Sequence, residues 1–248
     1  MTRREACDTL FTVIFALALL SSGGARSSDL HDAVAHDDLN RSQALIAAGA
    51  DVNELDLSGT PLHIAVARGS VAIAQALIDA GADLEAEDDS GAHPLHTAVR
   101  SNELAAATLL IQRGASVDAH DRQGMTPLII AARAGRAEMA KALLDAGANP
   151  DLEDTTYHDP PVRYAVYANR LDIVKLLLSR GVAIDVRSGH NGETPLWYAS
   201  MDGRADIVEF LLEQGADAKI ADGAGKAPYE VARDQRIRDL LVRYGANN

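Results

Sequence analysis

Apolar residues recur along most of this chain at the spacing of amphipathic α-helices. In the segment 205–213, Ile207, Val208 and Leu211 stand at intervals that place them on one face of a helix. A shorter apolar segment, which opens with Pro195, comes just before it. The same order of a short and a longer apolar segment returns repeatedly between residue 29 and the C-terminus. The pattern therefore predicts a series of helix pairs.

Particular residues mark where the first helix of each pair begins and ends. Thr60 stands directly before Pro61, where a threonine caps the helix and a proline is tolerated in the first turn. The first helix is followed by glycine or asparagine, which tolerate the left-handed backbone that ends a helix. These residues are Gly69, Asn102, Gly135, Asn169 and Gly203. We therefore expect short first helices, such as 61–68.

The start and end signals repeat in phase. The prolines are Pro61, Pro94, Pro127, Pro161, Pro195 and Pro228, and the steps between them are 33, 33, 34, 34 and 33 residues. A Gly-Ala-Asp motif or a close variant follows each second helix, as in 81–83, and an alanine follows each proline by four residues. Changes in length fall between the closing glycine and the next proline, which indicates a loop there. Such a period predicts stacked units that share one core.

The residues at the repeating positions resemble the ankyrin repeat. Thr60-Pro61-Leu62-His63 matches its opening motif, Thr194-Pro195-Leu196-Trp197 matches it except at the last residue, and Gly81-Ala82-Asp83 matches its closing motif. The resemblance runs from about Asp29 to the C-terminus. It implies an all-α ankyrin-repeat solenoid of stacked helix pairs with β-hairpin loops. Polar residues at both ends predict capping repeats that keep the stack soluble.

The predicted boundaries follow from the repeat. They are a signal peptide over 1–25 and an ankyrin-repeat domain over 26–248, divided into an N-terminal cap 29–55, repeats 56–88, 89–120, 121–153, 154–187 and 188–221, and a C-terminal cap 222–248.

The first 25 residues have the pattern of a secretory signal peptide. Arg3 and Arg4 precede an apolar run over 10–20, and small residues lead to Ala25. A membrane-spanning helix needs roughly 20 apolar residues, so cleavage is favoured over retention as an anchor. Cleavage also removes Cys7, the single cysteine. We therefore expect a periplasmic or secreted protein without stable membrane insertion.

The charge of the chain argues against one class of partner. The formal net charge is -13 and the isoelectric point is about 4.9. Binding to nucleic-acid phosphates requires clustered lysine and arginine, so no nucleic-acid partner is expected. We interpret acidic runs such as 85–89 mainly as solvated surface, with attraction of a basic partner as the alternative.

Aromatic residues make up only 4% of the chain and are unevenly placed. Beyond the predicted signal peptide, none stands before Tyr157. Four aromatic residues fall at positions expected to face the core: Tyr164, Tyr198, Phe210 and Tyr229. Trp197 replaces the motif histidine, and its position is left open between core and surface.

The resemblance also indicates where a partner would bind. Partners of ankyrin repeats usually meet the hairpin tips and the exposed end of the first helix. The predicted partner-binding residues in these places are Arg100, Arg133, Tyr157, Tyr167, Trp197 and Met201. Arginine, tyrosine and methionine are enriched in protein interfaces, which favours this assignment.

The sequence contains none of the common catalytic motifs, and neither a cofactor nor a metal ion is expected. His158 and His190, with Asp159 nearby, are the one arrangement considered for zinc, although loop histidines are usually solvated. The prediction is a non-enzymatic, monomeric protein–protein interaction module of the bacterial envelope, which inhibits, protects or chaperones a partner enzyme through its concave face. A multi-partner scaffold and, less favoured, a metal-dependent hydrolase at His158 and His190 are the alternatives.

Overall fold

The computed structural model describes residues 27–189 and 191–246. The predicted signal peptide, residues 1–25, lies outside these described residues, as does His190. The chain divides into two compact units, which meet in sequence between Ser116 and Val117.

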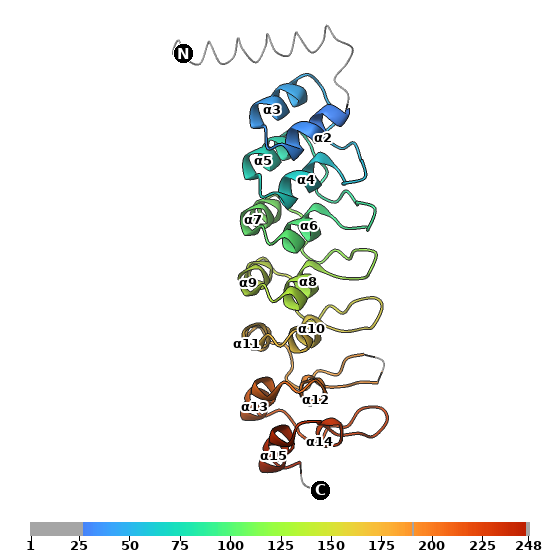
Figure 1. Ribbon diagram of the computed structural model, residues 1–248, viewed down its shortest axis with the longest axis vertical. Helices are drawn as coiled ribbons and strands as arrows, with labels where there is room; N and C mark the ends of the chain where they lie inside the picture. The colour runs from blue at the N-terminus through green and yellow to red at the C-terminus, as the bar shows by residue number, and fades with distance from the viewer. Residues whose placement is uncertain (1–26, 190, 247–248) are drawn as a thin grey trace. The chain divides into compact units, whose positions relative to one another are not determined.

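Unit 1 contains three successive helix pairs. Its helices are α2 (Ser27–Ala35), α3 (Leu39–Ala47), α4 (Pro61–Ala67), α5 (Val71–Asp79), α6 (Pro94–Ser101) and α7 (Leu104–Gln112). The first helices α2, α4 and α6 pack in one row, and the second helices α3, α5 and α7 pack in the adjacent row (Figure 1). The predicted helix pairs of the N-terminal cap and of the first two repeats are present in this unit.

Unit 2 continues the same pattern with four helix pairs. Its helices are α8 (Pro127–Ala134), α9 (Ala137–Asp145), α10 (Pro161–Tyr167), α11 (Leu171–Ser179), α12 (Pro195–Met201), α13 (Ala205–Glu213), α14 (Pro228–Val231) and α15 (Gln235–Arg243). Helices α8, α10, α12 and α14 form the row of first helices, and α9, α11, α13 and α15 form the second row. The all-α repeat architecture expected from the sequence is confirmed.

The predicted start and end signals act as expected. The Thr126 side-chain oxygen accepts a hydrogen bond from the backbone N–H of Ile129 at 3.2 Å, which caps α8. At the other end of the first helices, Asn102 and Gly135 have φ values of 63° and 70°. This left-handed backbone turns the chain into the second helix, and only glycine and asparagine adopt it at low cost.

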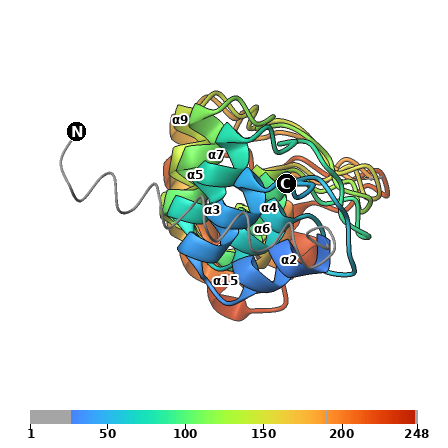
Figure 2. The ribbon, with the colours of Figure 1, turned by 90° about the horizontal axis from the view of Figure 1, so that it is seen from above.

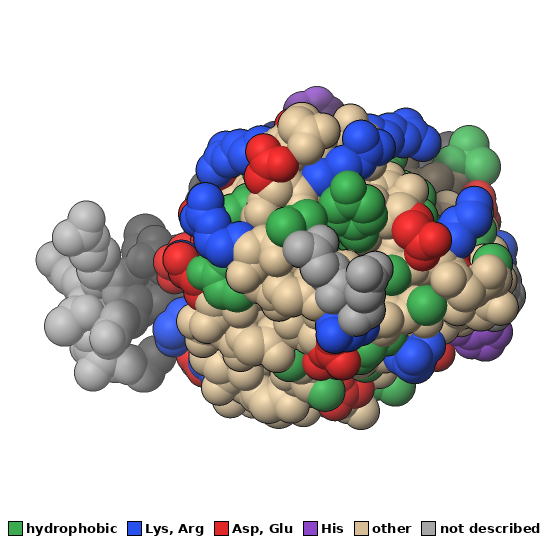
Figure 3. Space-filling view, turned by 90° about the horizontal axis from the view of Figure 1, so that it is seen from below, with side chains coloured by type: hydrophobic (Ala, Val, Ile, Leu, Met, Phe, Trp, Pro, Cys, Tyr) green, Lys and Arg blue, Asp and Glu red, His purple; other side chains and the backbone are tan. Residues whose placement is uncertain are grey.

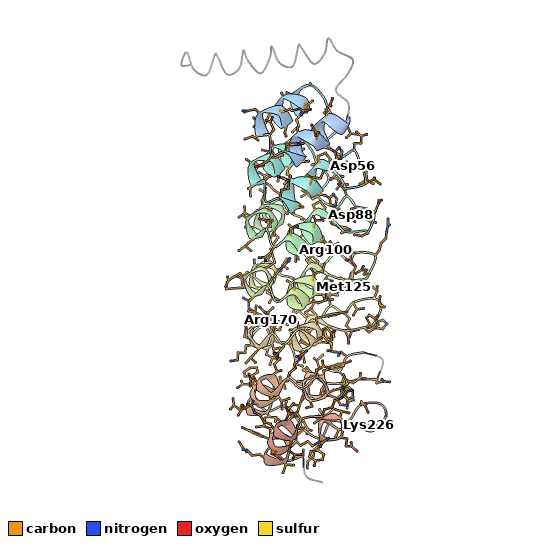
Figure 4. The ribbon with its side chains drawn as sticks, in the orientation of Figure 1. Asp56, Asp88, Arg100, Met125, Arg170 and Lys226 are labelled. Carbon is orange, nitrogen blue, oxygen red and sulfur yellow. The ribbon has the colours of Figure 1, made fainter. Side chains whose placement is uncertain are left out.

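The loops between repeats are hairpin turns organised by aspartate. In the hairpin between α5 and α6, the Asp88 carboxylate accepts backbone hydrogen bonds from Ser90 and Ala92 at 2.8 and 2.9 Å (Figure 4). Aspartates stand at the matching place in four other hairpins, and Ser188 replaces the aspartate before α12: the four are Asp56, Asp121, Asp154 and Asp222. Isolated bridges join Asp56 to Gly59 and Ser188 to Glu193, and the described residues contain no longer strand. Within each unit, the hairpins project on the side of the first helices (Figure 2).

The motif histidine of α4 links this helix to the next hairpin. His63 is buried, and its Nε2 donates a hydrogen bond to the carbonyl oxygen of Ala92 at 2.9 Å. Burial lowers the pKa of His63, which keeps the ring neutral and leaves Nδ1 free to accept from the N–H of Thr60 at 3.2 Å. Trp197 replaces the histidine in unit 2, and its Nε1 donates to the carbonyl oxygen of Lys226 at 3.0 Å. The indole therefore links α12 to the next hairpin as His63 links α4, and Trp197 lies in the core.

Small and aliphatic side chains form the core. The recurring alanines Ala65, Ala98, Ala131, Ala165, Ala199 and Ala232 are at most 1% exposed, so the first helices approach closely. Of the aromatic residues expected in the core, Tyr198 is buried, and Tyr164 and Phe210 are partly buried. The prediction was wrong for Tyr229, which is exposed, because α14 is a single turn that α12 and α15 do not fully cover.

The last helix has the polar face predicted for a cap. Helix α15 buries Ile237, Leu240 and Leu241 against its neighbours, and Arg236 pairs with Glu209 of α13 at 3.2 Å. On the face that α14 and α15 present, basic and acidic side chains surround separate hydrophobic ones (Figure 3).

Candidate partner-binding surface

The structure brings three of the six predicted binding residues together. Arg133 at the end of α8, Tyr157 in the hairpin before α10 and Tyr167 at the end of α10 line one open hollow of about 580 Å³ in unit 2. We call it the Tyr157 hollow. The Tyr157 and Tyr167 side chains are 60% and 57% exposed, so their rings are available for contact with a partner.

The hairpin 154–160 places Tyr157 through a buried carboxylate. Asp154 is 1% exposed, and its side chain accepts hydrogen bonds from the backbone N–H groups of Thr156, Tyr157 and Asp159 at 2.8, 2.6 and 3.0 Å. This hairpin has no glycine, and His158 adopts the left-handed backbone instead, with φ of 58°. The saturated carboxylate compensates for the strained turn, since each bond is strengthened by the charge.

Tyr164 forms part of the same hollow, although the sequence assigned it to the core. Its hydroxyl donates to Asp154 at 3.0 Å, and the residue lines the hollow beside Met125. Burial, and then the adjacent Asp154 carboxylate, raise the pKa of the Tyr164 hydroxyl, which therefore stays protonated and donating. Arg122, Gln123 and Thr156 also line the hollow and were not predicted. These residues sit in hairpins with ordinary loop composition, so the sequence carried no signal for them.

Trp197 and Met201 line a different hollow. It has a volume of about 350 Å³, lies between α12 and the hairpin before α14, and is also lined by Glu193, Lys226 and Arg233. Met201 is partly exposed, whereas Trp197 is only 7% exposed. Trp197 was predicted as a partner-binding residue. The structure buries most of its ring, and the bond to Lys226 holds the indole in place.

Arg100 belongs to unit 1. It stands in the last turn of α6, and its guanidinium lies 3.5 Å from the Ser90 hydroxyl of the preceding hairpin. Arg100 lies at the end of a first helix, as expected, but is only partly exposed (Figure 4).

A second polar cluster connects the hairpins before α10 and α12. Arg163, which occupies the motif-histidine position of α10, lies over the Tyr198 ring at 3.5 Å from its centroid and 3.5 Å from Asp202. The Tyr198 hydroxyl donates to Glu193 at 3.3 Å. Burial raises the pKa of Tyr198 to about 12, with the nearby Asp159 carboxyl as the next cause.

Asp159 is the titrating member of this cluster. Burial raises its pKa to about 6, and the Asp154, Glu193 and Glu153 carboxylates act in the same direction, while the Arg163 guanidinium opposes them. Its Oδ1 atom is buried without a hydrogen-bond partner among the described residues. The two hairpins are also joined by the Gly189 N–H, which donates to the His158 carbonyl oxygen at 3.0 Å.

The alternative site at His158 and His190 is described only in part. His158 is exposed, and its Nδ1 lies 3.7 Å from a Glu153 carboxylate oxygen. Over the described residues, no group of three or more His, Cys, Asp or Glu side chains is arranged to hold a metal ion. In the same part of the chain, no helix combines the length and the apolar character that crossing a membrane requires.

Comparison with known proteins agrees with the repeat. A family model described as ankyrin repeats (3 copies) matches residues 30–121, 75–154, 114–188 and 154–222. The ankyrin repeat domain of Bcl-3, a member of the IkappaB protein family, is similar in structure with a TM-score of 0.80 and 29% identity over 86% of this chain and 97% of that chain. The human ASB11 ankyrin repeat domain has a TM-score of 0.76 and 28% identity over 88% and 98% of the two chains. No curated protein sequence matches this chain.

Proposed function

Since this chain belongs to the ankyrin-repeat family, we propose that it is a protein–protein interaction module that binds a partner enzyme through the Tyr157 hollow. Ankyrin-repeat proteins are typically interaction domains without enzymatic activity, and the repeats of this chain indicate that it binds another protein. The partner and its place of action are inferred from the residues of this chain.

One observation carries the choice of surface. Arg133, Tyr157 and Tyr167 come from three separate places in the sequence and line one open hollow. Tyrosine and arginine supply a large share of the binding energy in protein interfaces, because they combine apolar area with hydrogen bonding. The buried Asp154 fixes the hairpin that carries Tyr157, so the surface is formed before a partner arrives and less entropy is lost on binding.

The proposed location rests on residues 1–25. Their basic start, apolar run and small-residue end support export and cleavage, which would leave a periplasmic or secreted protein without cysteine. In that compartment we propose that the protein acts as a monomer and as a stoichiometric inhibitor or protector of an envelope enzyme. The alternative role is a chaperone of that enzyme, which would use the same surface as an inhibitor or protector.

The test is affinity capture from a periplasmic extract, with the captured proteins identified by mass spectrometry. The wild-type protein is compared with a Tyr157→Ala/Tyr167→Ala variant, and Tyr244→Ala is the control because Tyr244 is 42% exposed outside the hollow. We expect one dominant enzyme, which the double variant loses and the control retains. Added protein should then change the activity or the thermal lifetime of that enzyme at a one-to-one ratio.

Two results would count against the proposal. A diffuse set of weakly enriched proteins would favour a scaffold. Equal capture by the wild type and the double variant would remove the Tyr157 hollow as the binding surface, provided that circular dichroism shows the same helix content in both.

A further inference from the structure

We infer that the Tyr157 hollow binds an acidic segment of the partner protein, in which a carboxylate pairs with Arg133 and adjacent apolar side chains pack on Tyr157 and Tyr167. The inference rests on the proposed function and specifies the chemistry of the bound segment.

Arg133 is the cation that is available for such a pair. Three other arginines of unit 2 are already engaged. Arg163 pairs with Asp202 at 3.5 Å, Arg170 donates to the Gly135 carbonyl oxygen at 2.6 Å, and Arg204 donates to a carbonyl oxygen at the end of α10 at 2.8 Å. Arg133 is exposed and has neither an ion pair nor a hydrogen bond with the described residues. An unpaired guanidinium is unexpected in a chain with a net charge of -13, where carboxylates are abundant.

The geometry of arginine fits a carboxylate. The planar guanidinium offers two parallel N–H groups, and carboxylates accept both at once. Arg133 and Tyr164 line the same hollow, and the Arg133 charge opposes the rise in the pKa of the Tyr164 hydroxyl. A carboxylate bound to Arg133 would lie in the hollow that the exposed rings of Tyr157 and Tyr167 also line.

A cationic ligand fits less well. Three tyrosines around one hollow can hold an ammonium group over their rings. Here, however, the Arg133 guanidinium lines the hollow and would repel it. The one carboxylate in the lining, Asp154, is 1% exposed and already accepts hydrogen bonds from three backbone N–H groups and the Tyr164 hydroxyl. The local charge that a ligand meets is therefore positive.

The test uses a displayed library of random peptides, selected on the purified full chain. The most enriched peptide is synthesised, and its Kd is measured by fluorescence anisotropy with the wild type, Arg133→Gln and Tyr167→Ala. The control is Arg68→Gln, which removes the same charge from the exposed end of α4. The peptide is also made with its acidic residue replaced by the corresponding amide.

We expect the enriched peptides to share an aspartate or glutamate next to an apolar residue. Arg133→Gln should raise the Kd about tenfold or more, because hydrogen bonds to charged groups contribute most. The amide peptide should lose a similar factor on the wild type and little further on Arg133→Gln, which is the signature of a direct pair. Arg68→Gln should change the Kd less than twofold.

The outcomes separate the inference from the proposed function. Peptides that lack a carboxylate, or whose Kd depends on Tyr167 but not on Arg133, would overturn the acidic segment and leave the hollow as the binding surface. Peptides that bind equally well to all variants, or no enrichment at all, would overturn the inference. If the protein captured from extract were also indifferent to Tyr157 and Tyr167, the proposed function would fail independently.

Discussion

Replacing Asp159 by asparagine should stabilise the protein against unfolding, compared with the wild type, more at neutral pH than at acidic pH. The Asp159 carboxyl lies in the polar cluster between two hairpins, and burial raises its pKa from 3.8 to about 6. At neutral pH the Asp159 carboxyl is ionised, and its buried Oδ1 atom has no hydrogen-bond partner among the described residues. Asparagine has nearly the same shape and no charge, and the backbone N–H of residue 159 keeps its bond to Asp154.

The sign follows from proton linkage. Between pH 3.8 and about 6 the folded protein binds more protons at Asp159 than the unfolded chain does, so this group stabilises the fold fully below pH 3.8. That contribution is lost as the pH rises through about 6. A shift of one pKa unit corresponds to about 1.4 kcal/mol. The rise from 3.8 to about 6 therefore corresponds to at most about 3 kcal/mol of unfolding free energy. Because the carboxyl is only half-buried, solvent screens its charge and we expect about 1 kcal/mol.

The assay is urea unfolding followed by circular dichroism, at about pH 4 and about pH 7.5. The quantity compared is the difference in unfolding free energy between Asp159→Asn and the wild type. It should shift by about 1 kcal/mol in favour of the variant at the higher pH. Asp151→Asn, at an exposed aspartate of the preceding loop, controls for the change in net charge.

Two results would refute this reasoning. A difference that is the same at both pH values would mean that Asp159 has no raised pKa. A variant that loses stability at the higher pH would mean that attraction to Arg163 outweighs the cost of burial.

Further predictions concern the hydrogen bonds between repeats and the glycines of the turns in unit 2. Trp197→Phe removes the indole N–H that donates to the Lys226 carbonyl oxygen, and we expect a loss of about 1 kcal/mol in the free energy of unfolding by urea, the net contribution of a typical hydrogen bond. Gly124→Ala should lower the melting temperature more than Gly215→Ala: both have positive φ, but only at Gly124 would the added methyl group meet the backbone of the next hairpin, whereas at Gly215 nothing lies within 4 Å. Arg204→Ala removes a 2.8 Å bond to the end of α10 and should cost about 1 kcal/mol, measured in the same way.

The repeat pattern was sufficient to predict the helix pairs and their ends. A proline in the first turn and a glycine or asparagine at the end of a helix act through the local backbone, so their effect does not depend on distant residues. Asn102 and Gly135 therefore have the left-handed backbone expected of them. The alanine four residues after each of these prolines is buried because every repeat packs against its neighbours through the same positions.

The candidate surface was predicted only in part. Exposure of Tyr157 and Tyr167 was foreseen from their place in the repeat, and both are exposed. The hollow itself depends on the Asp154 carboxylate, which fixes a glycine-free hairpin and binds Tyr164 from the next helix. These contacts join residues of different segments, so no single stretch of sequence contains them.

The sequence by itself determined the family, the repeat length and the left-handed backbone at the end of each first helix from α4 to α12, because these follow from local preferences repeated in phase. Only the tertiary structure decided that Trp197 is a buried brace, that Tyr229 is exposed, and that Arg133, Tyr157 and Tyr167 share one hollow. The physical reason is that burial and charge pairing depend on which side chains of neighbouring repeats fill the same space. The period of a repeat fixes where a residue stands, and the side chains packed around it decide what it can bind.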